Sequence, residues 1–238
     1  MVFTHFLHGW MSSATLHVIR YLATQRLQTA AVLLKLSQTA ACTAQAILHR
    51  FCETQEIGEN DVSAVARACL YLGAKIEEDA RPLREIITVF DRIDKRRKGE
   101  PLELLDYSSD EYAALRHQTV ELEREVLCEL GFHLHCEREH PHKLAMSYLR
   151  VLELPQLMQA AWSCANDSLR TPCCVRYPAN VVACGCIAFA ARHAAVSLPD
   201  DPPWWHLFCD PETEESSLHG VLMELARLHA WQAQRGAA

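Results

Sequence analysis

The chain has 238 residues, of which half are apolar, and its 30 acidic and 23 basic residues give a net charge of −7 at pH 7. A chain of this length buries about 70% of its unfolded surface on folding, so its core needs neither a metal nor disulfides for stability. The acidic balance argues against nonspecific binding of nucleic acid by the whole surface. Eleven cysteines are present, none in a C-x-x-C pair and most in apolar runs, which is typical of reduced, buried thiols in an intracellular protein.

No apolar run reaches the ~18 residues that a membrane-spanning helix requires, and the first residues lack the charge pattern of a signal peptide. The sequence also contains no phosphate-binding glycine loop, no H-E-x-x-H and no G-x-S-x-G motif. We therefore expect no membrane association, no cofactor and no enzymatic activity. One enzymatic alternative stays open, a thiol enzyme, which would need one fast-reacting cysteine of low pKa.

In chain order, apolar spacing and helix punctuation first predict three helices. The first covers residues 22–35, and Ser37 starts the second, whose apolar positions lie within residues 41–51. The third helix follows Asn60 and Asp61, two good N-cap residues. Its apolar stripe repeats at steps of three and four and consists of Val62, Val65, Cys69, Leu72 and Ile76.

Two more helices complete the first half of the chain. Pro82 stands in the first turn of the fourth, which is followed by a loop at Gly99. Ser108 and Glu111 form a capping box before the fifth helix, and Gly131 stops it. In the second half, prolines stand where new helices can begin, and no window alternates apolar and polar residues long enough for a strand. We predict an all-α fold.

Two segments of the second half repeat segments of the first. Residues 68–75 align with residues 185–192 at an offset of 117 positions. Residues 126–130 align with residues 221–225 at an offset of 95 positions. Because both matches keep their order and their helix context, internal duplication is favoured over chance.

The duplication predicts two tandem five-helix bundles, residues 22–134 and 135–238, after a short N-terminal extension over residues 1–21. Alanine, glycine and cysteine are concentrated in the central helix of each repeat, around Gly73 and Gly185. A helix surrounded by others needs small residues where the backbones approach closely. We therefore expect both helices to lie in the middle of their bundles.

Two charged residues border the apolar faces of the predicted third and fifth helices. At 100° per residue, Lys75 lies about 120° from the centre of its stripe, and Glu123 lies about 60° from Val126. Charges at the margins of packed helices are costly unless they are partnered. If the helices are neighbours, the two side chains pair with each other, or both await polar groups from a partner. The structural alternative is a snorkelling lysine and an ordinary surface acid.

Several segments resemble the cyclin family, and they occur in the order that the family has. Residues 68–78, A-C-L-Y-L-G-A-K-I-E-E, are similar to the third-helix signature of cyclins, and residues 123–132 resemble the fifth helix of the same box. Within the family, the transcription- and splicing-associated L type is the most similar, with the K and T types behind. Further matching segments lie at residues 81–90, 140–143, 165–170 and 204–205.

The resemblance implies two five-helix cyclin boxes that form the regulatory subunit of a cyclin-dependent kinase, in a heterodimer that leaves room for additional protein partners. By resemblance, Lys75 and Glu123 hydrogen-bond the kinase's regulatory helix. The apolar pocket around that helix is implied to consist of Leu72, Ile76 and Leu127. The L type also implies a nuclear protein that acts in transcription or pre-mRNA splicing.

Two polar clusters have structural explanations. The basic run at residues 95–98 fits a helix C-terminus, where cations favour the helix dipole, better than nuclear import or a contact with RNA or an acidic partner. A second cluster fits no standard zinc spacing, so we expect no metal site there. It consists of His133, His135, Cys136, His140 and His142.

A second function is a nucleic-acid-binding general transcription factor with the cyclin fold, of the transcription factor IIB type. That function requires a basic surface on the two repeats and a zinc ribbon. The acidic balance and the missing C-x-x-C pairs argue against it. We therefore expect a protein partner rather than nucleic acid.

Overall fold

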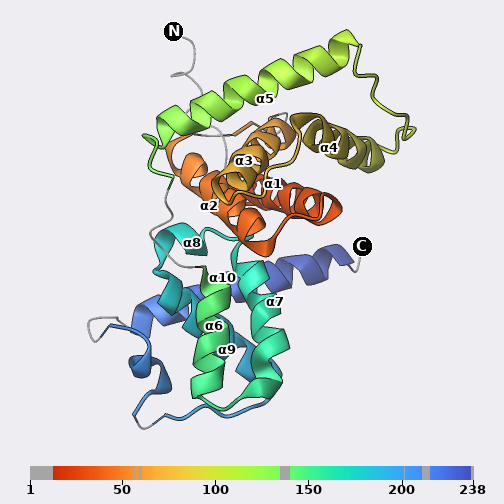
Figure 1. The fold of residues 1–238 in the computed structure, drawn as a ribbon. Helices are drawn as coiled ribbons and strands as arrows, with labels where there is room; N and C mark the ends of the chain where they lie inside the picture. Colours follow the sequence, from red (N-terminus) through yellow and green to blue (C-terminus); the bar gives the residue numbers. More distant parts are fainter. Residues whose placement is uncertain are drawn as a thin grey trace. The chain divides into compact units, whose positions relative to one another are not determined.

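The computed structural model consists of helices and their connections, and it contains no strand in the part of the chain that it describes (Figure 1). That part comprises residues 13–55, 57–58, 61–134, 140–200, 202–210 and 215–236. The predicted all-α fold is confirmed. The chain divides into two compact units, residues 1–134 and residues 135–238, and each has its own apolar core.

The first unit contains five helices around one central helix. The central helix α3 contacts each of the other four, which leaves little room for large side chains along it. Its stripe residues Val62, Val65, Cys69 and Leu72 are buried, as their spacing predicts. The helices are α1 (Ser13–Leu33), α2 (Gln38–Thr54), α3 (Val62–Ile76), α4 (Leu83–Lys98) and α5 (Asp110–Glu129).

The helix ends follow the predicted punctuation with two corrections. Ser37 caps α2 by accepting a hydrogen bond from the backbone N–H of Ala40 at 3.2 Å. The cap of α5 is Ser109 rather than Ser108, because the Ser109 hydroxyl accepts from the backbone N–H of Tyr112 at 3.1 Å. Asp61 occupies the N-cap position of α3, but its side chain makes no capping hydrogen bond.

The boundary expected between residues 21 and 22 falls inside a helix. The helix α1 already begins at Ser13, so nine residues that were assigned to an N-terminal extension are helical. Residues 1–12 lie outside the described part of the chain.

The second unit is built around α9, which contacts α6, α7, α8 and α10. Its described residues form five helices, the predicted number, although one of them, α8, has only four residues. Between α9 and α10 the described residues form only the short 3₁₀ turn η2. The elements are α6 (Pro141–Val151), η1 (Pro155–Leu157), α7 (Met158–Ser168), α8 (Cys173–Arg176), α9 (Ala179–His193), η2 (Trp204–Leu207) and α10 (Glu215–Gly236).

The two central helices are repeats of each other down to their last turn. Both α3 and α9 have 15 residues, and their first residues lie 117 positions apart, the offset found in the sequence. Each helix is followed by a left-handed residue, Glu78 at φ +56° and Ala195 at φ +52°. The backbone N–H groups of these residues donate to equivalent carbonyls, those of Lys75 and Arg192. The same ending follows α1 at Lys35 and α6 at Glu153, so it agrees with the duplication but is not specific to it.

Glycine allows a close helix contact in each unit. A Cβ atom at Gly73 would lie 2.7 Å from the Cβ atom of Ala44 in α2. A Cβ atom at Gly185 would lie 2.5 Å from Cγ1 of Val221 in α10. Real Cβ atoms do not approach so closely, so packing requires glycine at Gly73 and at Gly185.

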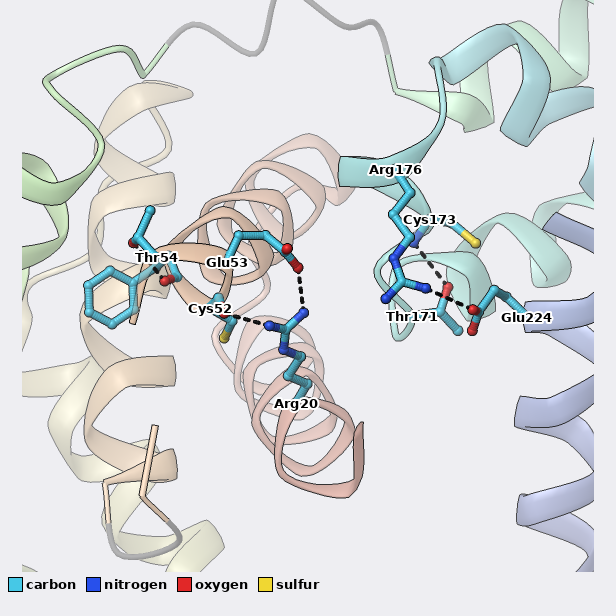
Figure 2. Close-up of polar contacts among 9 residues, drawn as sticks. Arg20, Cys52, Glu53, Thr54, Thr171, Cys173, Arg176 and Glu224 are labelled. Carbon is cyan, nitrogen blue, oxygen red and sulfur yellow. Dashed lines mark hydrogen bonds and ion pairs between the residues drawn. The ribbon is translucent and has the colours of Figure 1, made fainter. Parts of the chain in front are cut away.

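Arginine side chains join helices at the edge of each unit (Figure 2). Within the first, the guanidinium of Arg20 on α1 binds the carboxylate of Glu53 at 2.6 Å and the carbonyl of Cys52, both in the last turn of α2. Within the second, Arg176 on α8 binds the carboxylate of Glu224 on α10 at 3.0 Å. Each contact fixes a peripheral helix to another helix of its own unit.

Candidate functional site

Lys75 and Glu123 form an ion pair and hydrogen bond between α3 and α5. The ammonium group lies on the more open side, since 39% of the Lys75 side chain is exposed against 11% of the Glu123 side chain. Of the two arrangements that the sequence left open, the unbound chain adopts the internal pair. An accessible ammonium held beside a nearly buried carboxylate offers a donor and an acceptor at one place.

Tyr71 is part of this site, although sequence reasoning did not select it. The ammonium of Lys75 lies 4.2 Å from the centre of the Tyr71 ring, one turn earlier on α3. A cation over an aromatic face is attracted by the ring quadrupole. The ring therefore holds the lysine head group near Glu123. The signal in the sequence was the spacing of four residues between Tyr71 and Lys75 on one helix.

The predicted apolar site residues lie around this pair but differ in exposure. Leu72 is only 4% exposed and belongs to the core. Ile76 and Leu127 are half-buried and pack against the edge of the same core. A surface partner can therefore reach Ile76 and Leu127, whereas Leu72 supports the helix from below.

A second polar contact joins α3 to α5 and was not foreseen. Arg67 is 3% exposed, and its guanidinium donates to the hydroxyl of Thr119 at 2.7 Å and to Oε1 of Gln118 at 2.9 Å. Burial is the main reason that the pKa of Arg67 falls to about 10. Together with the Lys75–Glu123 pair, this contact fixes α5 along α3.

The basic run at the end of α4 has the structural role that was favoured. Residues 95–98 form the last turn of α4, and Gly99 ends the helix at φ +73°. Lys95 pairs with Asp91 one turn earlier at 2.8 Å. The run therefore places cations at a helix C-terminus, beside a partly buried acid of the same helix.

The histidine-rich segment is only partly described, because residues 135–139, including His135 and Cys136, lie outside the described part. His142 is buried, and its Nε2 atom lies 3.0 Å from Oδ1 of Asn166. Its ring meets the edge of the Trp162 ring, with 4.8 Å between centroids. Burial lowers the pKa of His142. Among the described residues, no three His, Cys, Asp or Glu side chains gather to hold a metal ion.

Most of the described cysteines are buried, and none of those described forms a disulfide. Burial raises the pKa of the Cys52 and Cys173 thiols to about 11. Such thiols are poor nucleophiles at neutral pH. The thiol of Cys209 lies 3.7 Å from that of Cys184 and donates a hydrogen bond to it. Cys209 is itself only 7% exposed.

Two family models match consecutive parts of the chain. The cyclin N-terminal domain matches residues 11–135, and the cyclin-T2-like C-terminal domain matches residues 140–228. The chain belongs to the cyclin family. The two units are therefore the two cyclin boxes, and membership of this family confirms the expectation of a regulatory rather than a catalytic chain.

Curated relatives confirm the resemblance to L-type cyclins. The chain is 42% identical to Cyclin-L1-1 of Oryza sativa subsp. japonica over 220 residues, which are 92% of this chain and 50% of the relative. It is 36% identical to human Cyclin-L2 over 232 residues, which are 96% of this chain and 43% of the relative. The cyclin chain thus spans about half the length of the relatives that it matches.

Solved structures share the fold at low sequence identity. A chain of the yeast RNA Pol II CTD kinase CTDK-1 complex superposes with a TM-score of 0.76 at 18% identity, covering 92% of this chain and 67% of that one. A chain of the Chaetomium thermophilum CAK complex bound to ATP-gamma-S superposes with a TM-score of 0.59 at 16% identity, covering 92% of this chain and 65% of that one.

Within the described ranges, no helix has both the length and the apolar character that crossing a bilayer requires.

Proposed function

We propose that this cyclin is the regulatory subunit of a cyclin-dependent kinase that acts in transcription or pre-mRNA splicing in the nucleus. The observation that carries the proposal is the Lys75–Glu123 pair, half-open on its lysine side and bordered by Ile76 and Leu127. L-type relatives support the transcription or splicing assignment.

The mechanism is a shift of population in the kinase. Lys75 and Glu123 exchange part of their mutual interaction for hydrogen bonds to the kinase's regulatory helix, while Ile76 and Leu127 cover its apolar face. The cyclin binds that helix more tightly in its active position than in its inactive position. Binding therefore favours the active state of the kinase. The active state keeps the Lys–Glu ion pair that phosphoryl transfer requires.

Charge reversal tests whether the pair binds the kinase or only holds α3 to α5. Lys75→Glu and Glu123→Lys each place two like charges together, so both are expected to abolish pull-down of the kinase that co-purifies from native cells. The double variant Lys75→Glu/Glu123→Lys restores the internal pair but exchanges donor and acceptor. If both groups bind the kinase directly, the double variant also fails to bind.

Arg124→Glu is the matched control, because Arg124 neighbours Glu123 on α5 but pairs outward with the exposed Glu121 at 2.7 Å. This variant is expected to bind as the wild type does. Recovery of binding by the double variant would reduce the pair to a structural contact and contradict the assignment. Kinase activity of the wild-type complex on a peptide of the polymerase C-terminal domain tests the transcriptional role.

A further inference from the structure

The second box holds two cysteine thiols in contact, one on its central helix and one on the connection that follows this helix. Sγ of Cys184 on α9 lies 3.7 Å from Sγ of Cys209, which comes shortly after η2. The two residues are 25 positions apart in the sequence, so the fold of the box makes this contact. Cys184 is fully buried, whereas Cys209 is 7% exposed.

The contact between the two thiols is held in place by neighbouring side chains. Asn180, one turn before Cys184 on α9, donates from Nδ2 to the backbone carbonyl of Phe208 at 3.3 Å. The ring of Phe208 stacks on the ring of Tyr148 on α6, with 4.0 Å between centroids. The residue before Cys209 is therefore bound to both α9 and α6. Two reactive groups held together in this way react as if at a high local concentration.

The two thiols differ in how readily they react. A disulfide joins its sulfur atoms at about 2.05 Å, so the gap of 3.7 Å is within reach of a rotation of the two side chains. Cys209 reacts first, since it is the thiol that solvent reaches. Cys184 also lowers the pKa of Cys209, because the Cys184 thiol donates a hydrogen bond to the thiolate once Cys209 has lost its proton.

We propose that Cys184 and Cys209 form an oxidisable dithiol, a modification site at which a peroxide links α9 to the connection before α10. The Cys209 thiolate attacks one oxygen of hydrogen peroxide and breaks the O–O bond, which gives a sulfenic acid on Cys209 and one water. The thiol of Cys184 then attacks the sulfenic sulfur, which forms the S–S bond and releases a second water. In total the two thiols lose two electrons and two protons, and one peroxide is reduced to two waters.

The disulfide restrains the second box. It closes a loop over the 25 positions between the two cysteines and so reduces the conformational freedom of the unfolded chain. The oxidised box therefore resists unfolding, and a dithiol reductant reverses the effect by thiol–disulfide exchange. The site belongs to the second box alone, so it does not depend on the kinase proposed to bind through Lys75 and Glu123.

Peptide mapping of the whole chain tests the proposal directly. The purified protein is treated with a small molar excess of hydrogen peroxide, its remaining thiols are blocked with N-ethylmaleimide, and the monomer is digested with trypsin without reductant. Cys184 lies in the tryptic peptide of residues 177–192, and Cys209 lies in that of residues 193–227. We expect these two peptides to be joined in the major disulfide product. In urea that unfolds the chain, oxidation is expected to give a mixture of pairings instead.

Three variants assign the linkage. Cys184→Ala and Cys209→Ala are each expected to abolish the linked peptides. Cys186→Ala is the matched control, because Cys186 is equally buried on the same helix, and its removal leaves Cys184 as the only cysteine of the peptide. This variant is expected to link as the wild type does. Oxidation is expected to raise the Tm of the wild type by about 5 °C, to leave that of Cys209→Ala unchanged, and to be reversed by dithiothreitol.

Three outcomes would overturn the proposal. The first is a yield of the Cys184–Cys209 link that is no higher in the folded chain than in urea. The second is conversion of Cys209 to a sulfinic acid without any linkage, which would mean that Cys184 does not reach the sulfenic sulfur. The third is linkage of Cys209 to Cys186 or to a cysteine of another molecule, which would leave Cys184 without a part in the reaction.

Discussion

In the first cyclin box the central helix is joined to the last helix by charges, and in the second box the corresponding junction is apolar. Arg67 and Lys75 on α3 bind Thr119 and Glu123 on α5. The repeat positions of Arg67 and Lys75 on α9 are Cys184 and Arg192, of which Cys184 contacts another thiol. The same helix framework thus tolerates a charged junction in one box and an apolar junction in the other.

The two boxes are expected to differ most in how much unfolding free energy each loses at alkaline pH. Folded thiols keep their protons above pH 9, where unfolded thiols lose them, so the stability they contribute is present below pH 9 and is lost as pH rises through their folded pKa. Each such thiol removes at most about 1.4 kcal/mol of unfolding free energy per pH unit in that window. The thiols with a raised pKa are Cys42, Cys52 and Cys69 in the first box and Cys164, Cys173, Cys184 and Cys186 in the second.

Urea unfolding at pH 8 and pH 10.5 measures this loss. Four of the five tryptophans lie in the second box, so tryptophan fluorescence follows that box while circular dichroism follows both. The second box is expected to lose more stability, since it holds more of the raised thiols. An equal midpoint at the two pH values would contradict the assignment of buried, protonated thiols.

The polar junction itself is tested by Arg67→Ala. The variant removes a buried, doubly hydrogen-bonded cation, and we expect it to cost about 3 kcal/mol of unfolding free energy. Cys184→Ala at the repeat position removes only a small buried side chain and is expected to cost about 1 kcal/mol. Chemical denaturation of both variants gives the comparison. Equal costs would mean that Arg67 contributes packing alone.

Replacing the two contact glycines by alanine is expected to cost less unfolding free energy than Arg67→Ala, and the cost is expected to differ between the boxes. Gly73→Ala brings a Cβ atom against the backbone of Ala44 as well as its side chain, so α2 and α3 must separate. Gly185→Ala meets only the side chain of Val221. Both are expected to destabilise by about 1–3 kcal/mol, Gly73→Ala more, as measured by thermal unfolding. A stabilised Gly73→Ala variant would show that the two helices are not in close contact.

The smallest effect is a gain in stability at the shared helix end. Ala195 and Glu78 hold left-handed backbone conformations that glycine adopts without strain. Ala195→Gly and Glu78→Gly are each expected to raise stability by no more than about 1 kcal/mol, offset in part by the entropy of glycine in the unfolded chain. Similar shifts in the two variants would support equivalent helix ends, and a loss in one alone would count against them.

Much of this architecture could be predicted because it depends on local patterns. The stripe from Val62 to Ile76 and the offset of 117 located both central helices. The cap at Ser109 was misplaced by one residue, since Ser108 and Ser109 are chemically alike and only backbone geometry selects between them. The repeat predicts a fifth long helix in the second box, but the described residues between α9 and α10 form only η2. The prolines at positions 199, 202 and 203 leave room for only a short turn there.

The site was predicted in part for a related reason. Lys75 and Glu123 were found at the margins of two apolar stripes, where the rule for buried charge applies. Arg67 was overlooked because its partners lie on another helix, about 50 positions away in the sequence.

The buried thiols can also report when each box transiently unfolds. A thiol-specific reagent reaches the exposed Cys128 at once, whereas Cys69 and Cys186 react only when their box transiently unfolds. Labelling rates followed by mass spectrometry therefore measure the opening free energy of each box separately, with no engineered cysteine. A partner bound to one box should slow labelling in that box first, so the cysteines can report which box has been engaged.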